Sequence, residues 1–97
     1  MLGIKNKFPS GALVMTCAVN ELVAKNPEFA KFVTASLTRH LSGDWGELCE
    51  VDRQENEFGL LNNLRLFSVY KADNLPKIWI ITEADRSVTT VLFPEEY

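Results

Sequence analysis

The sequence has few of the residues from which metal and catalytic sites are usually built. It contains one histidine, His40, and two cysteines, Cys17 and Cys49. A single histidine needs partners to bind a metal, and the cysteine spacing matches no zinc motif. The chain also has no Gly-rich phosphate-binding loop and no readable pairing of a nucleophile with a base. We therefore expect no metal site and no cofactor.

Long apolar runs and an excess of positive charge are also missing. No run approaches the roughly 20 apolar residues that a membrane span needs. The apolar stretch after the first two lysines is too short for a signal peptide, so we interpret the start as mature chain in the cytoplasm. Cys17 and Cys49 are then expected to be free thiols. The alternative is a disulfide between them, which requires that folding brings the two residues together. Ten basic residues are scattered against 13 acidic ones, which does not favour direct nucleic-acid binding.

The remaining composition is that of a folded domain. The 97 residues are 46% hydrophobic and 10% aromatic. This is enough to bury a core in one domain spanning residues 1–97.

The first two-thirds of the chain, about residues 17–61, is mainly helical by pattern. Residues 11–16 fit a short strand or a first helical turn equally well. Residues 17–25 are predicted to be helical, and Asn26-Pro27-Glu28 is typical of the start of a second helix, which Ser42-Gly43 ends. We expect Asp44 to cap a third helix, because Glu47 follows it at the three-residue spacing of a capping box. An apolar face of that helix, over residues 47–61, would consist of Leu48, Val51, Phe58 and Leu61.

The last third of the chain, residues 65–93, has the pattern of β-strands. Residues 65–71, 77–83 and 88–93 are rich in β-branched and aromatic residues and are separated by short turns. Short connections favour an antiparallel meander, with 77–83 as a central strand. We predict an α+β two-layer domain, with N-terminal helices packed on three antiparallel strands, or four if residues 11–16 join them.

The segment "RHLSGDWGEL", residues 39–48, collects several candidate functional residues. His40 is either a histidine that stabilises the last helical turn or a general acid/base. Asp44 is either a helix cap or the group that orients His40. Trp45 is either a core anchor or an exposed binding aromatic.

A second cluster, "TEADRSVTT", covers residues 82–90. Asp85-Arg86-Ser87 fits the ordinary chemistry of a turn between strands. Alternatively, Arg86 with neighbouring hydroxyls could hold a phosphate or carboxylate, or form an ion pair with Glu83 or Asp44.

Six carboxylates lie between Asp44 and Glu57, against one arginine. They form either a solvated helix face or a docking surface for a basic partner, such as a nucleic-acid-binding protein. Our first hypothesis is a small non-enzymatic accessory protein that binds another protein through an acidic and aromatic surface. That surface would consist of Trp45, Glu47, Glu50, Glu55, Glu57, Asp85 and Arg86. The alternative is a small enzyme or nucleic-acid-acting toxin that uses His40, Asp44 and Arg86.

Three segments, "RHLSGDWGEL", "RLFSVY" and "KIWIITEADRSVTTVLFPEEY", together resemble a family of small bacterial proteins carried on plasmids, phages and integrated elements. The resemblance covers residues 39–97, and two positions depart from it. Leu64 stands where the family has glycine, and the turn after Tyr70 lacks the usual Asp-Gly. The resemblance implies a mobile-element setting and no particular activity. In that setting, our first hypothesis is an accessory protein of a mobile element that binds a host or defence protein. The partner's identity and the oligomeric state stay open.

Overall fold

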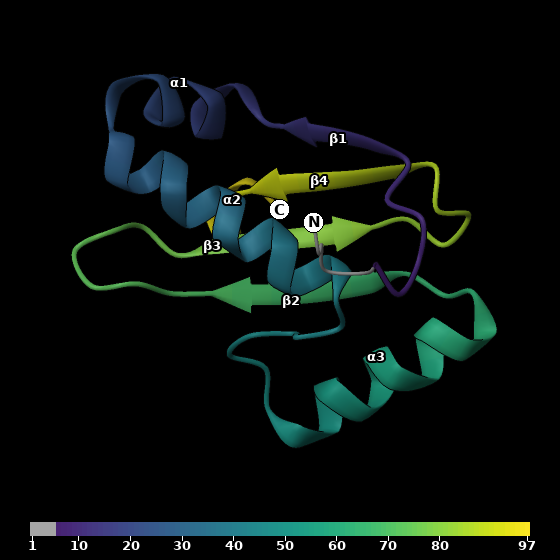
Figure 1. Cartoon of the computed structure of the whole chain (residues 1–97). Coiled ribbons are helices and arrows are strands. Elements are labelled where there is room, and N and C mark those ends of the chain that lie inside the picture. The colour runs from purple at the N-terminus through teal and green to yellow at the C-terminus, as the bar shows by residue number, and fades with distance from the viewer. Residues whose placement is uncertain (1–5) are drawn as a thin grey trace, which may run out of the picture.

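The computed structural model describes residues 6–97, which fold into helices packed on a four-stranded sheet (Figure 1). The predicted α+β fold is confirmed. Expectations about the start of the chain fall partly on residues 1–5, outside the described range. In chain order the elements are β1 (Ala12–Met15), α1 (Cys17–Lys25), α2 (Pro27–Leu41), α3 (Glu50–Asn62), β2 (Leu66–Tyr70), β3 (Ile78–Thr82), β4 (Val88–Leu92) and the 3₁₀ turn η1 (Pro94–Glu96).

The sheet has the strand order β1-β4-β3-β2. The β2, β3 and β4 strands form the predicted antiparallel meander, with β3 between its two neighbours. Residues 11–16 resolve as a strand, β1, but it pairs with β4 in parallel, so the sheet is mixed rather than wholly antiparallel. A parallel neighbour requires a long connection, and the helices and the rest of the meander supply it.

The two N-terminal helices begin where the sequence predicts. Thr16 caps α1 by accepting a hydrogen bond from the Val19 amide, and Asn26 caps α2 by accepting from the Glu28 amide at 3.0 Å. Both helices cover the same face of the sheet, whereas α3 lies beyond the β2 edge (Figure 1). The apolar stripe of α2 buries Phe29 and Val33 against the sheet.

The prediction that Asp44 starts a helix is wrong. The third helix begins at Glu50, with Cys49 at the N-cap, and residues before it form a loop along the edge of β2. Gly46 has φ 76°, and a side chain there would collide with the Val69 carbonyl. The left-handed backbone of Gly46 stops helix propagation at this point. The Glu47 amide then donates to the Val69 carbonyl at 2.7 Å, which attaches the loop to β2.

The predicted apolar face of α3 does not face the core. Val51, Phe58 and Leu61 are 66%, 60% and 83% exposed, whereas Asn56 and Gly59 are the buried residues of the helix. The Asn56 amide accepts from the Phe67 N–H at 3.2 Å and donates to the Phe67 carbonyl at 2.5 Å. These bonds turn the Asn56 side of α3 toward the sheet edge and leave Val51, Phe58 and Leu61 in solvent.

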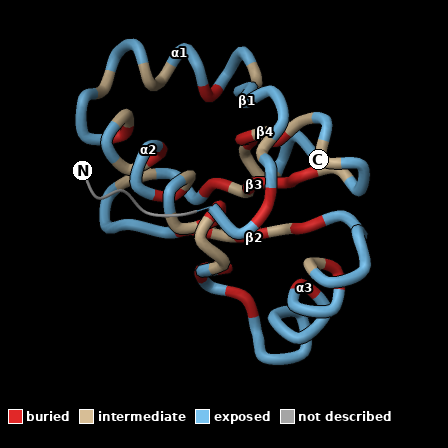
Figure 2. The backbone as a smooth tube through the Cα atoms, turned by 45° about the vertical axis from the view of Figure 1, so that its right-hand side comes forward, coloured by how far each residue is buried: buried red, intermediate tan, exposed pale blue. Residues whose placement is uncertain are grey.

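Two apolar clusters form the core. Figure 2 shows buried residues along β2, β3 and β4 and in the loop before α3. The larger cluster joins α1 and α2 to the inner face of the sheet. The smaller one contains Phe8, Leu41, Trp45, Leu48 and Leu66 and lies where the end of α2 meets the loop and β2. Trp45 is 2% exposed, so it is a core residue.

Candidate functional site

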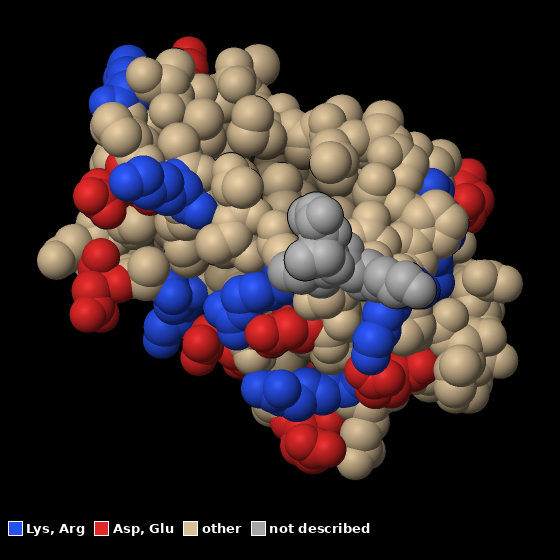
Figure 3. All heavy atoms as spheres, in the orientation of Figure 1, with Lys and Arg blue, Asp and Glu red and all other residues tan. Residues whose placement is uncertain are grey.

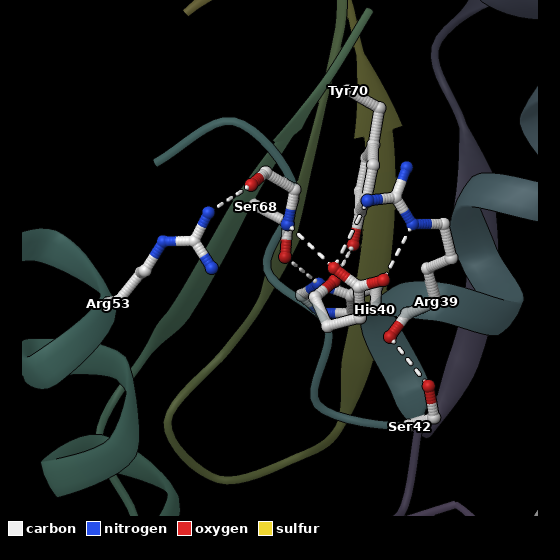
Figure 4. A network of polar contacts seen from close by, with 8 residues as sticks. Arg39, His40, Ser42, Arg53, Ser68 and Tyr70 are labelled. Carbon is white, nitrogen blue, oxygen red and sulfur yellow. Dashed lines mark hydrogen bonds and ion pairs between the residues drawn. The ribbon is translucent and has the colours of Figure 1, made fainter. Parts of the chain in front are cut away.

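His40 is fully buried between α2 and the sheet, where both of its ring nitrogens are hydrogen-bonded. Its Nδ1 lies 2.5 Å from the Ser68 Oγ on β2, and its Nε2 lies 2.9 Å from the Thr82 Oγ1 on β3. Figure 4 shows the imidazole beside Ser68 and Tyr70. The last turn of α2 thus reaches two strands through one side chain.

His40, Ser68, Thr82 and Thr89 form a buried network of hydrogen bonds. The donor and acceptor of each bond can be assigned by starting from Thr89. The Thr89 hydroxyl donates to the Ser10 carbonyl at 2.8 Å, which uses its only proton. Thr82 must therefore donate to Thr89 across their 2.7 Å contact, and its oxygen accepts from His40. The proton of His40 is then on Nε2, and Nδ1 accepts from the Ser68 hydroxyl. Within residues 6–97, no buried side-chain nitrogen or oxygen lacks a partner.

Burial keeps this imidazole uncharged. Loss of hydration lowers the pKa of His40 to about 3. The rings of Phe8 and Trp45 meet it edge-on at centroid distances of 5.5 and 5.6 Å. His40 therefore has no route to a substrate in this structure, and its contacts are those of a core residue.

Asp44 is directed at Arg39 rather than at His40. The Arg39 guanidinium donates twice to the carboxylate, at 2.8 and 3.1 Å, and holds the pKa of Asp44 below its usual range. The carboxylate also accepts from the Gly46 amide, and the Asp44 carbonyl accepts from the Tyr70 hydroxyl at 2.6 Å. These bonds fix the loop between α2 and α3 (Figure 4).

Arg86 joins the β3–β4 turn to the end of α3. It has φ 61°, and its guanidinium donates to the Leu64 carbonyl at 2.6 Å and to the Gly59 carbonyl at 3.1 Å. A cation at a helix C-terminus neutralises the partial charge of its free carbonyls. Arg86 and His40 both contact Phe8, but no hydrogen bond joins their side chains among the described residues. Asp85 accepts from the Ser87 amide at 3.0 Å, as expected for a turn residue.

The predicted acidic and aromatic surface separates into buried and exposed parts. The indole of Trp45 donates to the Glu57 carboxylate at 2.8 Å, so this pair connects the loop to α3. Glu47, Glu50 and Glu55 are exposed. The structure thus leaves these three carboxylates available on the surface but places Trp45 in the core.

The sequence did not predict one concave feature, which we name the α3 groove. It has a volume of about 740 Å³ between the exposed side of α3 and the start of β2. Its lining residues are Val51, Asp52, Gln54, Glu55, Asn56, Phe58, Leu64, Arg65 and Phe67. The sequence showed the helical spacing of the apolar residues in α3. It did not show that the helix presents them to solvent rather than to the core.

A second hollow continues the α3 groove onto the outer face of the sheet. It has a volume of about 300 Å³ and shares Arg65 and Phe67 with the groove, adding Trp79, Ile81 and Tyr97. The Trp79 ring meets Phe67 at 4.9 Å and Tyr97 at 5.5 Å. Arg65 lies over the Tyr97 ring and donates to its hydroxyl at 2.7 Å. Together the two hollows form one aromatic-lined surface.

No family model, curated protein or solved structure matches the chain. Across residues 6–97, no three His, Cys, Asp or Glu side chains are grouped so that they could hold a metal ion. Within the same range, none of the helices has the length and apolar character needed to cross a bilayer.

Proposed function

We propose that this chain is a small non-enzymatic accessory protein that binds a protein partner through the α3 groove. One observation carries the proposal. The helix turns Asn56 toward the sheet and presents Val51, Phe58 and Leu61 to solvent. Exposed apolar residues gathered beside a groove are typical of protein-binding surfaces. Single exposed apolar residues would carry no such meaning, but these share one helix face.

The charge around the α3 groove supports a basic partner. Asp52 and Glu55 line the groove, and Glu50 lies on the same helix. An amphipathic helix with apolar anchors and flanking lysines or arginines would meet both features of the surface. The resemblance to small mobile-element proteins supports a host or defence protein in the cytoplasm as the source of that helix.

The enzymatic alternative has less support from the geometry. It requires His40, Asp44 and Arg86 to face a common open pocket. His40 is enclosed, Asp44 bonds to Arg39, and Arg86 donates to backbone carbonyls. No observation on these residues favours a reaction, so the binding function is the one that we propose.

Affinity capture from bacterial host lysate tests the proposal. We expect Phe58→Ser with Leu61→Ser to abolish capture of a specific partner, because both side chains would be anchors. Glu50→Lys with Glu55→Lys should weaken capture in a salt-dependent way. All four residues are exposed, so the folded state should change by no more than about 1 kcal/mol.

A matched control and a direct reporter make the test decisive. Val14→Ser changes an exposed apolar residue on β1, away from the α3 groove, and should keep the partner. In a Trp45→Phe background, Trp79 is the sole tryptophan and lies in the adjoining hollow, so its fluorescence should shift when the partner binds. Capture of the same proteins by the wild type and the α3 variants would contradict the proposal.

A further inference from the structure

The two edges of the sheet are treated differently. On the β2 edge, the Glu47 amide bonds to Val69, and the Asn56 side chain bonds to both backbone groups of Phe67. At the other end of the order β1-β4-β3-β2, the outer edge of β1 pairs with nothing in residues 6–97. The protein thus closes one edge with an asparagine and a loop, and leaves the other open.

The backbone groups that face outward from β1 can be identified. The Ala12 amide donates to the Ser87 carbonyl at 3.0 Å, and the Thr16 amide donates to the Val91 carbonyl at 3.1 Å. Backbone groups alternate along a strand, so the N–H and C=O groups of Leu13 and Met15 point away from β4. These two residues offer the donors and acceptors that an added strand would use.

The β1 edge lacks the usual features that prevent strand addition. Natural edge strands carry lysine, proline or a bulge. Residues 8–20 contain no charged residue, and Pro9 lies outside the strand. Leu13, Val14 and Met15 are 53%, 41% and 38% exposed. Figure 3 shows the broad uncharged surface on this side of the molecule.

We propose that β1 pairs in antiparallel orientation with β1 of a second copy of this chain, about a twofold axis at Val14. In this register Leu13 lies opposite Met15 of the partner subunit, and their outward backbone groups exchange hydrogen bonds. The two sheets become one continuous sheet.

A second copy is the occupant that the edge favours for two reasons. An antiparallel pair of identical strands is self-complementary about a twofold axis, so each bond is made twice. The uncharged edge also lets two chains of net charge −3 approach without facing like charges, whereas a charged partner would find no counter-charge there. The inference does not depend on the α3 groove, because the residues that line it belong to α3, to β2 and to the segment between them, at the opposite end of the strand order.

Disulfide trapping of the full chain tests the register. In a background with Cys17→Ser and Cys49→Ser, Val14→Cys should form an intermolecular disulfide on mild oxidation. The two Val14 Cα atoms would be about 4.5 Å apart as a non-hydrogen-bonded pair, within disulfide range. Ala12→Cys is the matched control, because its two copies would lie more than about 12 Å apart along the strands. Equal trapping of both variants would overturn the register.

Charged substitutions at Leu13 and Met15 test the pairing itself. The oligomeric state of each variant is measured by sedimentation velocity over a range of concentrations. The wild type should show a concentration-dependent dimer, and Leu13→Lys with Met15→Lys should raise its dissociation constant at least about tenfold, because lysines then face each other. Leu13→Glu with Met15→Glu should do the same, and an equimolar mixture of the two variants should restore the dimer.

The remaining outcomes are equally decisive. Phe58→Lys on α3 should leave the dimer unchanged, which separates this result from the proposed partner binding. Thermal melts check that each variant is folded. A wild type that stays monomeric up to millimolar concentration, or a mixture that fails to restore the dimer, would refute β1 pairing.

Discussion

The buried, uncharged His40 predicts that this domain loses stability in mild acid. The unfolded chain takes up a proton on His40 below its ordinary pKa of 6.5, whereas the folded chain does so only near pH 3. Between these values the unfolded state binds more protons. The contribution of His40 to stability is therefore complete above about pH 7 and is lost progressively as the pH falls toward 3.

The size of the effect follows from the same shift. One pKa unit corresponds to about 1.4 kcal/mol, so the fall from 6.5 to about 3 amounts to about 5 kcal/mol at full extent. At pH 5 the loss should be about 2 kcal/mol relative to pH 7.5. A domain of this size has a total unfolding free energy of roughly 5–15 kcal/mol, so this loss is readily measured.

The side chains in contact with the His40 ring do not titrate in this window. The side chains that bond to or stack on the imidazole, namely Ser68, Thr82, Phe8 and Trp45, carry no charge. The pKa values of Asp44 and Asp85 are lowered from 3.8, by Arg39 and by Ser87 respectively. Their stabilising contribution is present above their unfolded pKa and is lost only below about pH 4.

Urea denaturation from pH 4.5 to 7.5 measures the effect, with His40→Gln as the reference. Glutamine keeps an N–H donor for Thr82 but does not titrate, so the difference between the two proteins isolates the imidazole. We expect His40→Gln to be less stable by about 2–4 kcal/mol at pH 7.5, because it loses packing and the bond from Ser68. That difference should narrow by about 2 kcal/mol at pH 5.

Nuclear magnetic resonance gives an independent reading, because His40 is the sole histidine of the chain. Its ring signals in the folded protein should not titrate between pH 5 and 8. The Nε2–H tautomer should also be visible in the ring nitrogen shifts. A titration midpoint near 6.5 in the folded state, or a stability difference that is constant with pH, would refute the reasoning.

Three other substitutions test the roles that the structure assigns. Trp45→Ala should destabilise the fold by about 3–5 kcal/mol in thermal or urea unfolding, and a near-neutral result would contradict its burial. Asn56→Ala should cost about 1–3 kcal/mol through its two lost bonds to Phe67, while Gln54→Ala, which loses only an exposed bond, should stay within about 0.5 kcal/mol. Arg86→Ala should speed hydrogen exchange at the end of α3, and unchanged exchange there would exclude the capping role.

Local signals predicted those elements whose ends are set by nearby residues. The Asn26-Pro27 start of α2 and the three C-terminal strands follow from capping chemistry and alternation, and both are observed. The prediction that a helix starts at Asp44 was wrong. Asp44 and Glu47 have the spacing of a capping box whether or not Gly46 adopts a left-handed backbone. The contact of Gly46 with Val69 joins residues that are distant in sequence, so periodicity carries no trace of it.

The prediction of which side of α3 faces the core was wrong for a related reason. A 3–4 spacing of apolar residues predicts an amphipathic helix but leaves open what its apolar side will contact. Here Asn56 replaces a strand partner for Phe67 and thereby decides which side faces the sheet. Asn56 stands among other polar residues in the middle of the helix, so the sequence did not single it out as the buried one.

The attachment of α3 bears on the proposed binding of a partner. The helix is held by hydrogen bonds from Asn56, from Arg86 and between Trp45 and Glu57. Of its apolar residues, Leu60 packs against the smaller core cluster, whereas Val51, Phe58 and Leu61 are exposed. We expect α3 to open at a lower free energy than the core, because most of its apolar residues are exposed. A partner that covers Phe58 and Leu61 would add the apolar burial that the isolated domain lacks, so binding should stabilise α3 itself. Amide exchange in residues 50–62 should therefore slow on binding more than exchange in β3, whose core packing is already complete. An equal slowing of both would mean that the partner stabilises the domain without contacting α3.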